Sequence, residues 1–176
     1  MTILDLQAAH VDDLLSFMGR LPAGDLTFIK DDVSPAAVSA WPAAPGHRWV
    51  ALRQDGSVAG FAALLPLSSL SDHVAELRLV VDPVTRGQGI GRELALHALG
   101  SALRSGLLKV IVEIVATQER TIEMFLGLGF TGEALLRDHF RDRSGDLQDL
   151  IMLAHFAEQT FDAMDLVGVA DALEGN

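Results

Sequence analysis

Residues 77–93 read LRLVVDPVTRGQGIGRE. An apolar run ends at Asp82-Pro83, a glycine-rich turn follows, and an amphipathic stretch begins directly after the turn. Each glycine in the first turn of a helix costs about 1 kcal/mol relative to alanine, so we expect glycines where side chains would obstruct a group that approaches the backbone. A helix N-terminus presents free N–H groups and the positive end of the helix dipole, which together favour phosphate. The stretch therefore predicts a strand, a phosphate-binding turn and a helix.

Two familiar phosphate-binding loops fit this stretch poorly. A P-loop closes with Gly-Lys-Ser/Thr, whereas Gly91 is followed here by Arg92-Glu93. A dinucleotide-binding fold places Gly-x-Gly-x-x-Gly after its first strand, whereas the spacing here is Arg-x-x-Gly-x-Gly in the middle of the chain. Residues 86–91 instead resemble the acetyl-CoA motif of the GNAT acetyltransferase superfamily. The resemblance implies that backbone N–H groups hold the pyrophosphate of CoA and that no metal is required.

A second segment, residues 117–130, also resembles the GNAT pattern. The family commonly reads Asn-x-x-Ala-Ile-x-x-Tyr-x-x-x-Gly-Phe there, and this chain keeps Ile122, Gly129 and Phe130. Gln118 stands in place of asparagine and Phe125 in place of tyrosine. The two segments together imply acetyl-CoA as co-substrate, and the positions expected to bind it are Val80, Val81, Arg86, Gly87, Gln88, Gly89, Ile90, Gly91, Arg92, Gln118 and Phe125.

The composition favours a single folded domain. The chain has 176 residues, 49% of them hydrophobic, so it can bury a core of ordinary size. It has no cysteine, which excludes a thiol nucleophile and a disulfide framework. The net charge is −11 and no run of Lys and Arg occurs, which argues against a nucleic-acid partner. With no long apolar run and no basic N-terminal segment, we expect a cytoplasmic protein with no membrane partner.

The order of elements read from hydrophobic periodicity is also that of the GNAT superfamily. We expect an α/β (α+β) fold with a mixed, mostly antiparallel central sheet of about seven strands flanked by helices. We expect residues 1–155 to form this GNAT-like domain and residues 156–176 to form an acidic helical tail. The expected strands are 2–7, 48–53, 57–65, 74–81, 107–115, 130–142 and 146–155, and the expected helices are 8–21, 35–41, 89–105 and 118–128.

Glu76 is the candidate catalytic base. Strand alternation places Glu76, Arg78 and Val80 on one face of the strand that leads into the loop. Desolvation in a partly buried cleft is expected to raise the pKa of its carboxyl group towards a range useful for accepting a proton. Residues 75–82 also resemble a stretch of bacterial protein-lysine acetyltransferases whose glutamate is the general base. His73 and His139 are rival bases, whereas His97 is expected on a solvated helix face and His10 and His155 at the periphery.

The group that protonates the departing thiolate has no obvious candidate. The family usually supplies a tyrosine hydroxyl, and this chain contains no tyrosine. Phe125 keeps the ring and lacks the donor, so the resemblance assigns it only a packing role against CoA. Trp41, Trp49 and Phe28 are either lining residues of an acceptor pocket or core residues.

The leading function is therefore an acetyl-CoA-dependent N-acetyltransferase, which acts on a primary amine by direct attack in a ternary complex. The acceptor is either a small molecule or an amino group of a peptide or protein, and the enzyme is a monomer or a homodimer. The alternatives are a non-catalytic acyl-CoA-binding sensor, favoured by the missing tyrosine, and a nucleotide-binding fold. Residues 23–45 and 137–145 are expected to shape the acceptor pocket.

Overall fold

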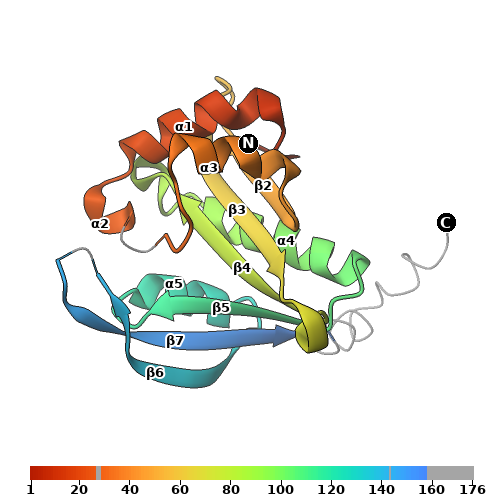
Figure 1. The fold of residues 1–176 in the computed structure, drawn as a ribbon, viewed down its shortest axis with the longest axis vertical. Helices are drawn as coiled ribbons and strands as arrows, with labels where there is room; N and C mark the ends of the chain where they lie inside the picture. Colours follow the sequence, from red (N-terminus) through yellow and green to blue (C-terminus); the bar gives the residue numbers. More distant parts are fainter. Residues whose placement is uncertain (27–28, 143, 158–176) are drawn as a thin grey trace.

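The computed structural model describes residues 1–26, 29–142 and 144–157. In these residues seven strands form one sheet in the order β1-β2-β3-β4-β5-β7-β6 (Figure 1). The strands are β1 (Thr2–Asp5), β2 (His47–Leu52), β3 (Val58–Pro66), β4 (Val74–Val81), β5 (Lys109–Val115), β6 (Thr131–Arg141) and β7 (Leu147–Phe156). The expected mixed, mostly antiparallel α/β fold is confirmed. The expected helical tail, residues 156–176, lies almost wholly outside the described residues, and the division at residue 155 stays a prediction.

Among the described strands, β4 and β5 are the one parallel pair, and their pairing is short. It joins residues 74–76 of β4 to residues 109–111 of β5, with Glu76 opposite Ile111 as the last matched pair. Beyond that point β4 stays paired with β3 through Val81, while β5 stays paired with β7 through Val115. Figure 1 shows the two strands starting side by side and running apart. The sheet is therefore split along residues 77–81 of β4.

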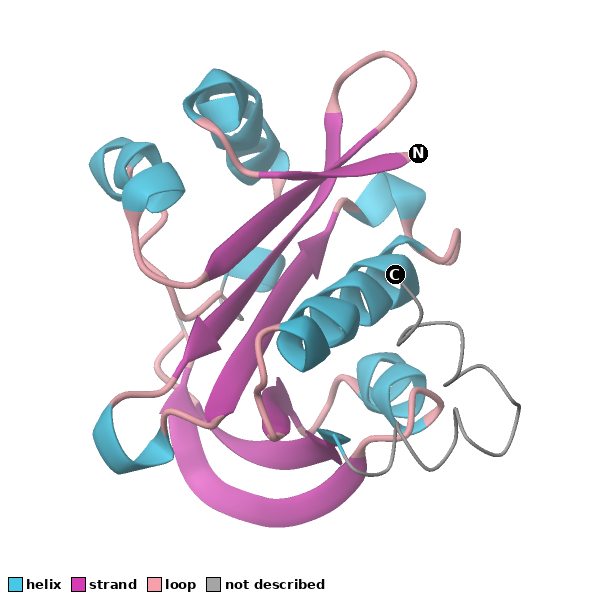
Figure 2. Ribbon diagram, turned by 90° about the vertical axis from the view of Figure 1, so that its right-hand side faces the viewer, coloured by secondary structure: helices cyan, strands magenta, loops and turns pink. Residues whose placement is uncertain are grey.

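Helices cover both faces of the sheet (Figure 2). One core lies beneath α4 (Ile90–Arg104) and α5 (Glu119–Leu126), and it contains Leu77 of β4 and Leu94 of α4. A second core, on the opposite face, contains Phe17 of α1 and Val38 of α3. The remaining helices are α1 (Val11–Arg20), α2 (Ala23–Leu26) and α3 (Pro35–Ala40), with short 3₁₀ turns at Ala8–His10, Trp41–Ala43, Ser69–Ser71 and Pro83–Thr85. None of the described helices is long and apolar enough to cross a membrane.

Several local expectations are confirmed. The Ser34 hydroxyl caps α3 by accepting from the N–H of Ala37 at 3.3 Å, and proline follows at the first helical position. Gly56 adopts φ = +83° in the turn between β2 and β3, the conformation that favoured glycine in the predicted hairpin. Most predicted boundaries differ from the observed ones by one or two residues. The helix predicted from Ala8 begins with a 3₁₀ turn and becomes α-helical at Val11, and α2 lies in residues 22–34, where no helix is expected from the sequence.

Candidate active site

The glycine-rich loop joins β4 to α4 through the 3₁₀ turn Pro83–Thr85. Gly87 and Gly89 have φ values of +78° and +84°, which L side chains rarely adopt, and a Cβ atom at either would meet nothing within 4 Å. The helix begins at Ile90, one residue later than predicted, with Gly89 as its N-cap and the Gly89 carbonyl accepting from the N–H of Glu93 at 3.0 Å. Gly87 and Gly89 therefore precede the helix and permit the backbone turn, and of the three glycines of the motif only Gly91 lies in the first turn of the helix.

This loop has the properties of an anion site. The first N–H groups of α4 have no partner within the helix, and residues 86–89 are exposed. No side chain projects from Gly87 or Gly89 to block an approach to the backbone. The N–H of Gln88, one of the groups expected to face the phosphates, is directed to the Thr85 carbonyl at 3.4 Å. The donors that remain at the start of the helix belong to Gly89, Ile90, Gly91 and Arg92.

Asp82 fixes the base of the loop. Its carboxylate accepts from the N–H of Val84 at 3.1 Å and from Arg53 Nη2 at 2.8 Å, and Arg20 Nη2 lies 3.7 Å away. Burial alone raises the pKa of this carboxyl group, but these hydrogen bonds and cations outweigh burial and lower it. The start of the loop is thereby joined to the β2–β3 hairpin and to the end of α1.

The split in the sheet leads from this loop to Glu76. Residues 77–81 of β4 pair with β3 along one edge and have no register partner in β5 along the other. Those five residues span roughly 17 Å at 3.3 to 3.4 Å per residue. Val80 and Val81 lie at the loop end of this segment, and Glu76 lies where the two strands begin to separate. The peptide groups of this segment that point towards β5 have no register partner there, so an extended ligand lying between the glycine loop and Glu76 can pair with them.

Glu76 lies in a network of charged side chains on the face of β4 opposite α4. The residue is only 7% exposed. Its two carboxylate oxygens accept from Lys30 Nζ at 2.6 Å and from Arg78 Nη2 at 2.7 Å. Lys30 also donates to Glu113 of β5 at 2.7 Å, and Arg78 donates to Asp31 at 2.6 Å. The alternation of β4 is as predicted, since Leu77, Leu79 and Val81 face the α4 core.

The expected direction of the Glu76 pKa is wrong. Burial does raise the pKa of the carboxyl group, as the sequence argument held. The hydrogen bonds from Arg78 and Lys30, together with the charges of those two groups, outweigh burial and lower the pKa overall. In this arrangement Glu76 is an ionised carboxylate held between two cations.

The two arginines that flank the loop differ in their contacts. Arg86 Nη2 lies 2.8 Å from Asp25 Oδ1 of α2, although half of the arginine side chain is exposed. Asp25 therefore brings α2 next to the glycine loop. Arg92 lies exposed in the first turn of α4. Both positions are compatible with contact to phosphate oxygens, as charged donors, and both assignments stay predictions.

The second motif lies along α5. Gln118 is the N-cap of this helix and is partly buried. Phe125 is 2% exposed, and its ring packs edge-on against Phe130 at 5.0 Å between centroids. Met124 approaches the start of α4: a Cβ atom at Gly91 would lie 3.4 Å from its sulfur. In this structure Phe125 belongs to the core beneath α4 and α5, and its contact with CoA stays a prediction.

The histidines and tryptophans are only partly as expected. His73 and His139 are exposed. His97 is half-buried and packs edge-on against Trp49 at 5.2 Å, because α4 is pressed onto β2 at this point. Trp41 and Trp49 belong to the two cores. Phe28 lies outside the described residues.

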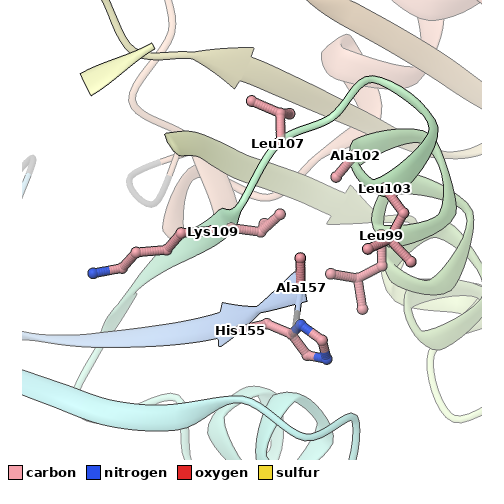
Figure 3. A pocket seen from close by; sticks show the side chains of 8 residues that line it. Leu99, Ala102, Leu103, Leu107, Lys109, His155 and Ala157 are labelled. Atoms are coloured by element: carbon pink, nitrogen blue, oxygen red, sulfur yellow. The ribbon is translucent and has the colours of Figure 1, made fainter. Parts of the chain in front are cut away.

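His155 was expected at the periphery, and the structure corrects this. It is 9% exposed, packs against Phe130 at 5.3 Å, and its pKa is lowered by burial. With Leu99, Leu107 and Lys109 it lines a small pocket between the end of α4 and strands β5 and β7 (Figure 3). The pocket holds about 10 Å³, room for about one water molecule. It is far too small for a cofactor.

Several residues of the site are not predicted from the sequence. Lys30, Asp31 and Asp25 lie in residues 23–45, for which the sequence predicts only a general contribution to the acceptor pocket. Glu113 is the one carboxylate of β5, a strand that is apolar between Lys109 and Glu113, and a charged residue within such a strand is the signal that could have identified it. Asp82 could have been recognised as a cap, because Asp-Pro is a common start of a helical turn.

Comparisons with known proteins agree with this geometry. A family model described as the acetyltransferase (GNAT) family matches residues 16–130, which is more than half of the chain. The chain belongs to the GNAT acetyltransferase family. The matched region of this GNAT protein includes the C-terminal half of α1, the glycine loop, Glu76 and α5.

Two curated relatives are N-acetyltransferases by name. N-alpha-acetyltransferase RimI of Mycobacterium tuberculosis is 30% identical over 121 residues, which cover 68% of this GNAT chain and 75% of that protein. The uncharacterized N-acetyltransferase YjgM of Escherichia coli is 30% identical over 87 residues, which cover 49% of this chain. The match spans about half of YjgM, 52% of its length.

Solved structures share the fold. A ribosomal-protein-alanine N-acetyltransferase from Brucella melitensis has a TM-score of 0.78 at 23% identity, covering 89% of this chain and 99% of that one. The putative acetyltransferase yncA from Salmonella typhimurium, solved with acetyl-CoA, has a TM-score of 0.77 at 22% identity. The match covers 89% of this chain and 93% of that one. A protein that shares the fold of this chain has thus been solved with acetyl-CoA.

Proposed function

We propose that this GNAT protein transfers the acetyl group of acetyl-CoA to a primary amine by direct attack in a ternary complex. The observation that carries the proposal is the split in the sheet, with an exposed anion site at one end and a buried carboxylate at the other. Residues 77–81 of β4 connect the two with a strand edge that β5 does not cover.

The residues present fit acetyl-CoA. The N-terminus of α4 and the open positions at Gly87 and Gly89 suit a pyrophosphate. The uncovered edge of β4 suits the amide groups of a pantetheine arm, because both partners are extended and carry peptide-like donors and acceptors. Acetyl-CoA supplies a thioester carbonyl that an amine can attack. Arg86 and Arg92 add charge next to the phosphates, provided that Arg86 exchanges Asp25 for phosphate oxygen.

Glu76 receives the proton from the acceptor. An amine attacks only through its neutral nitrogen, so a protonated acceptor must first lose a proton to a base within hydrogen-bond reach. Glu76 is ionised and lies where the split begins, next to the expected position of the thioester. Because its pKa is lowered, the proton transfer from an ammonium group is uphill, and the carboxylate also orients the acceptor. No side chain is assigned to protonate the thiolate, since Phe125 has no donor.

The acceptor is proposed to be cationic. The chain carries a net charge of −11, so anionic acceptors would be repelled on approach. The carboxylates of Glu76, which is buried, and Glu113, which is partly buried, add negative charge at the proposed acceptor position. Relatives named for N-alpha or ribosomal-protein-alanine acetylation support an amino group of a peptide or protein, and a small-molecule amine is the alternative.

A direct test combines a binding titration with a turnover assay. Release of free thiol from acetyl-CoA is measured with a panel of cationic amines and peptides with free amino termini, beside calorimetric titration of acetyl-CoA. We expect binding and amine-dependent thiol release. Binding without release across the panel would favour the acyl-CoA-binding sensor, which the names of the relatives do not favour. Affinity for ATP or NAD instead of acetyl-CoA would favour the nucleotide-binding alternative.

A further inference from the structure

Lys30 contributes an amino group to the proposed acceptor position. It lies between α2 and α3, 46 residues before Glu76 in the chain, yet its Nζ atom is 2.6 Å from Glu76 Oε1. The same nitrogen is 2.7 Å from Glu113 Oε2 on β5. Lys30 therefore bridges the two strands close to the point at which they separate, on the face of the sheet opposite α4.

This is the geometry that a general base requires of an acceptor. A base must lie about 2.6 to 3.2 Å from the atom whose proton it removes, and the Lys30–Glu76 distance falls at the start of that range. The uncovered segment of β4 runs from the anion site to Glu76, so a thioester arm laid along it ends beside the same carboxylate. The Lys30 side chain is 34% exposed, so the amine is not sealed in the core.

We propose that Lys30 is itself an acetyl acceptor, modified by the acetyl-CoA bound to the same chain. This inference rests on the proposed function. In the reaction Glu76 takes a proton from the Lys30 ammonium, and the neutral Nζ attacks the thioester carbonyl. The new N–C bond forms as the C–S bond breaks, and the thiolate leaves with the electron pair. A second proton passes from Nζ to the thiolate or to water, so the products are Nζ-acetyl-Lys30 and CoA.

The reaction is slow at neutral pH and faster at higher pH. The charged and titratable groups around Nζ are Glu76 and Arg78 on β4, Glu113 on β5, and Asp31 beside Lys30. Burial lowers the pKa of the lysine, but the hydrogen bonds to Glu113 and Glu76 outweigh burial and raise it overall. A smaller fraction of Lys30 is then neutral at a given pH than for an ordinary lysine, and this fraction grows as pH rises.

The chain provides its own control. Its two lysines are Lys30 and Lys109. Lys109 is also held by a carboxylate, with Nζ 2.7 Å from both oxygens of Glu133, and its side chain is 23% exposed. The two lysines are therefore similar in ion pairing and accessibility. Non-enzymatic acetylation should therefore not prefer Lys30 over Lys109. Acetylation by the proposed site should prefer Lys30, because only this lysine lies beside Glu76.

The test is incubation of the purified full chain with acetyl-CoA and no added acceptor, followed by intact-mass measurement and peptide mapping. We expect one acetyl group per chain at Lys30 and none at Lys109, formed at a rate per molecule that is independent of protein concentration. The Lys30→Arg variant should gain no acetyl group, and Glu76→Gln should acetylate Lys30 at least tenfold more slowly. Chain unfolded in urea should show no preference between the two lysines.

The result with the wild-type chain decides the inference by itself, so the test remains valid even if a variant fails to fold. An unmodified Lys30, equal acetylation of both lysines, or a rate proportional to protein concentration would each overturn it. If Lys30 stays unmodified while the amine panel is acetylated, the inference fails and the proposed function stands. If acetyl-CoA neither binds nor releases thiol with any amine, both fail.

Discussion

Glu76 of β4 and Glu113 of β5 share a single ammonium group, that of Lys30, whose Nζ lies 2.6 Å from one carboxylate and 2.7 Å from the other. The two strands have just ceased to pair at this point, since Glu76 is the last residue of β4 with a partner in β5. Two like charges placed across a widening gap repel each other, and the ammonium offsets that repulsion. The contact between Glu76 and Glu113 through Lys30 therefore closes the narrow end of the split.

The role of Glu76 is tested by Glu76→Gln, which keeps the shape of the side chain and removes its basicity. We expect kcat/KM for the amine to fall roughly 10²-fold or more, the range typical of the loss of a general base. Glu113→Gln is the matched control, because it shares the Lys30 ammonium but lies on the other strand, and its loss should be clearly smaller. Steady-state kinetics measure kcat/KM for both variants. An equal fall in the two variants would contradict a role for Glu76 that Glu113 does not share.

The glycine loop is tested by Gly89→Asp. The substitution strains a backbone at φ = +84° and places a carboxylate where the pyrophosphate is proposed, so acetyl-CoA binding should fall below detection in calorimetry. Gly106→Asp imposes a comparable strain at φ = +73°, also with open space around the new Cβ, just beyond the other end of α4. That variant should bind acetyl-CoA like the wild type. Unchanged affinity in a folded Gly89→Asp protein would contradict the loop assignment.

The missing acid is tested by Phe125→Tyr. If the ring edge of Phe125 faces the split, the new hydroxyl can donate to the departing thiolate, and we expect a modest gain in kcat with unchanged acetyl-CoA affinity. Phe130→Tyr is the control: this ring is equally buried, at 2% exposure, and contacts Phe125 directly. Its hydroxyl should be buried without benefit and lower the free energy of unfolding by about 1 to 3 kcal/mol. A stability loss of that size in Phe125→Tyr as well, with no rate gain, would place residue 125 away from the sulfur.

The anchor of the loop is tested by Asp82→Asn and by pH. The folded-state pKa of Asp82 is lowered, so its ion pairs stabilise the fold at pH values above the unfolded pKa, near 3.9, and this contribution disappears as pH falls through the folded pKa. Asp82→Asn should lower the free energy of unfolding at pH 7 by about 1 to 3 kcal/mol. Between neutral and acidic pH, the free energy of unfolding should also decrease less in this variant than in the wild type. Denaturant unfolding at several pH values measures both effects. The exposed Asp72→Asn should change neither, and an identical acid response in wild type and Asp82→Asn would contradict the anchor.

Sequence reasoning succeeded where the interactions are local. The order of strands and helices, the cap at Ser34 and the turn at Gly56 follow from neighbouring residues, whose spacing and conformational preferences are written in the chain. The glycine loop was predicted for the same reason, because a strand, a turn and a helix N-terminus occupy consecutive residues. The predicted start of α4 was wrong by one residue, because Gly89 has a positive φ that depends on how the loop meets the helix.

The electrostatic state of the site was decided by the tertiary structure. The partners of Glu76 and Glu113 meet across 46 and 83 residues of sequence, and Asp82 meets Arg53 across 29. Whether a buried carboxyl group has a raised or a lowered pKa depends on which cations approach it, and burial by itself gives the opposite sign from the one found for Glu76. Composition and alternation placed Glu76 on the correct face of β4, because side-chain direction alternates along any strand. Only the packing of α2, β4 and β5 brought Lys30 to it, because charge pairing over such distances depends on the closed fold and leaves no periodic pattern in the sequence.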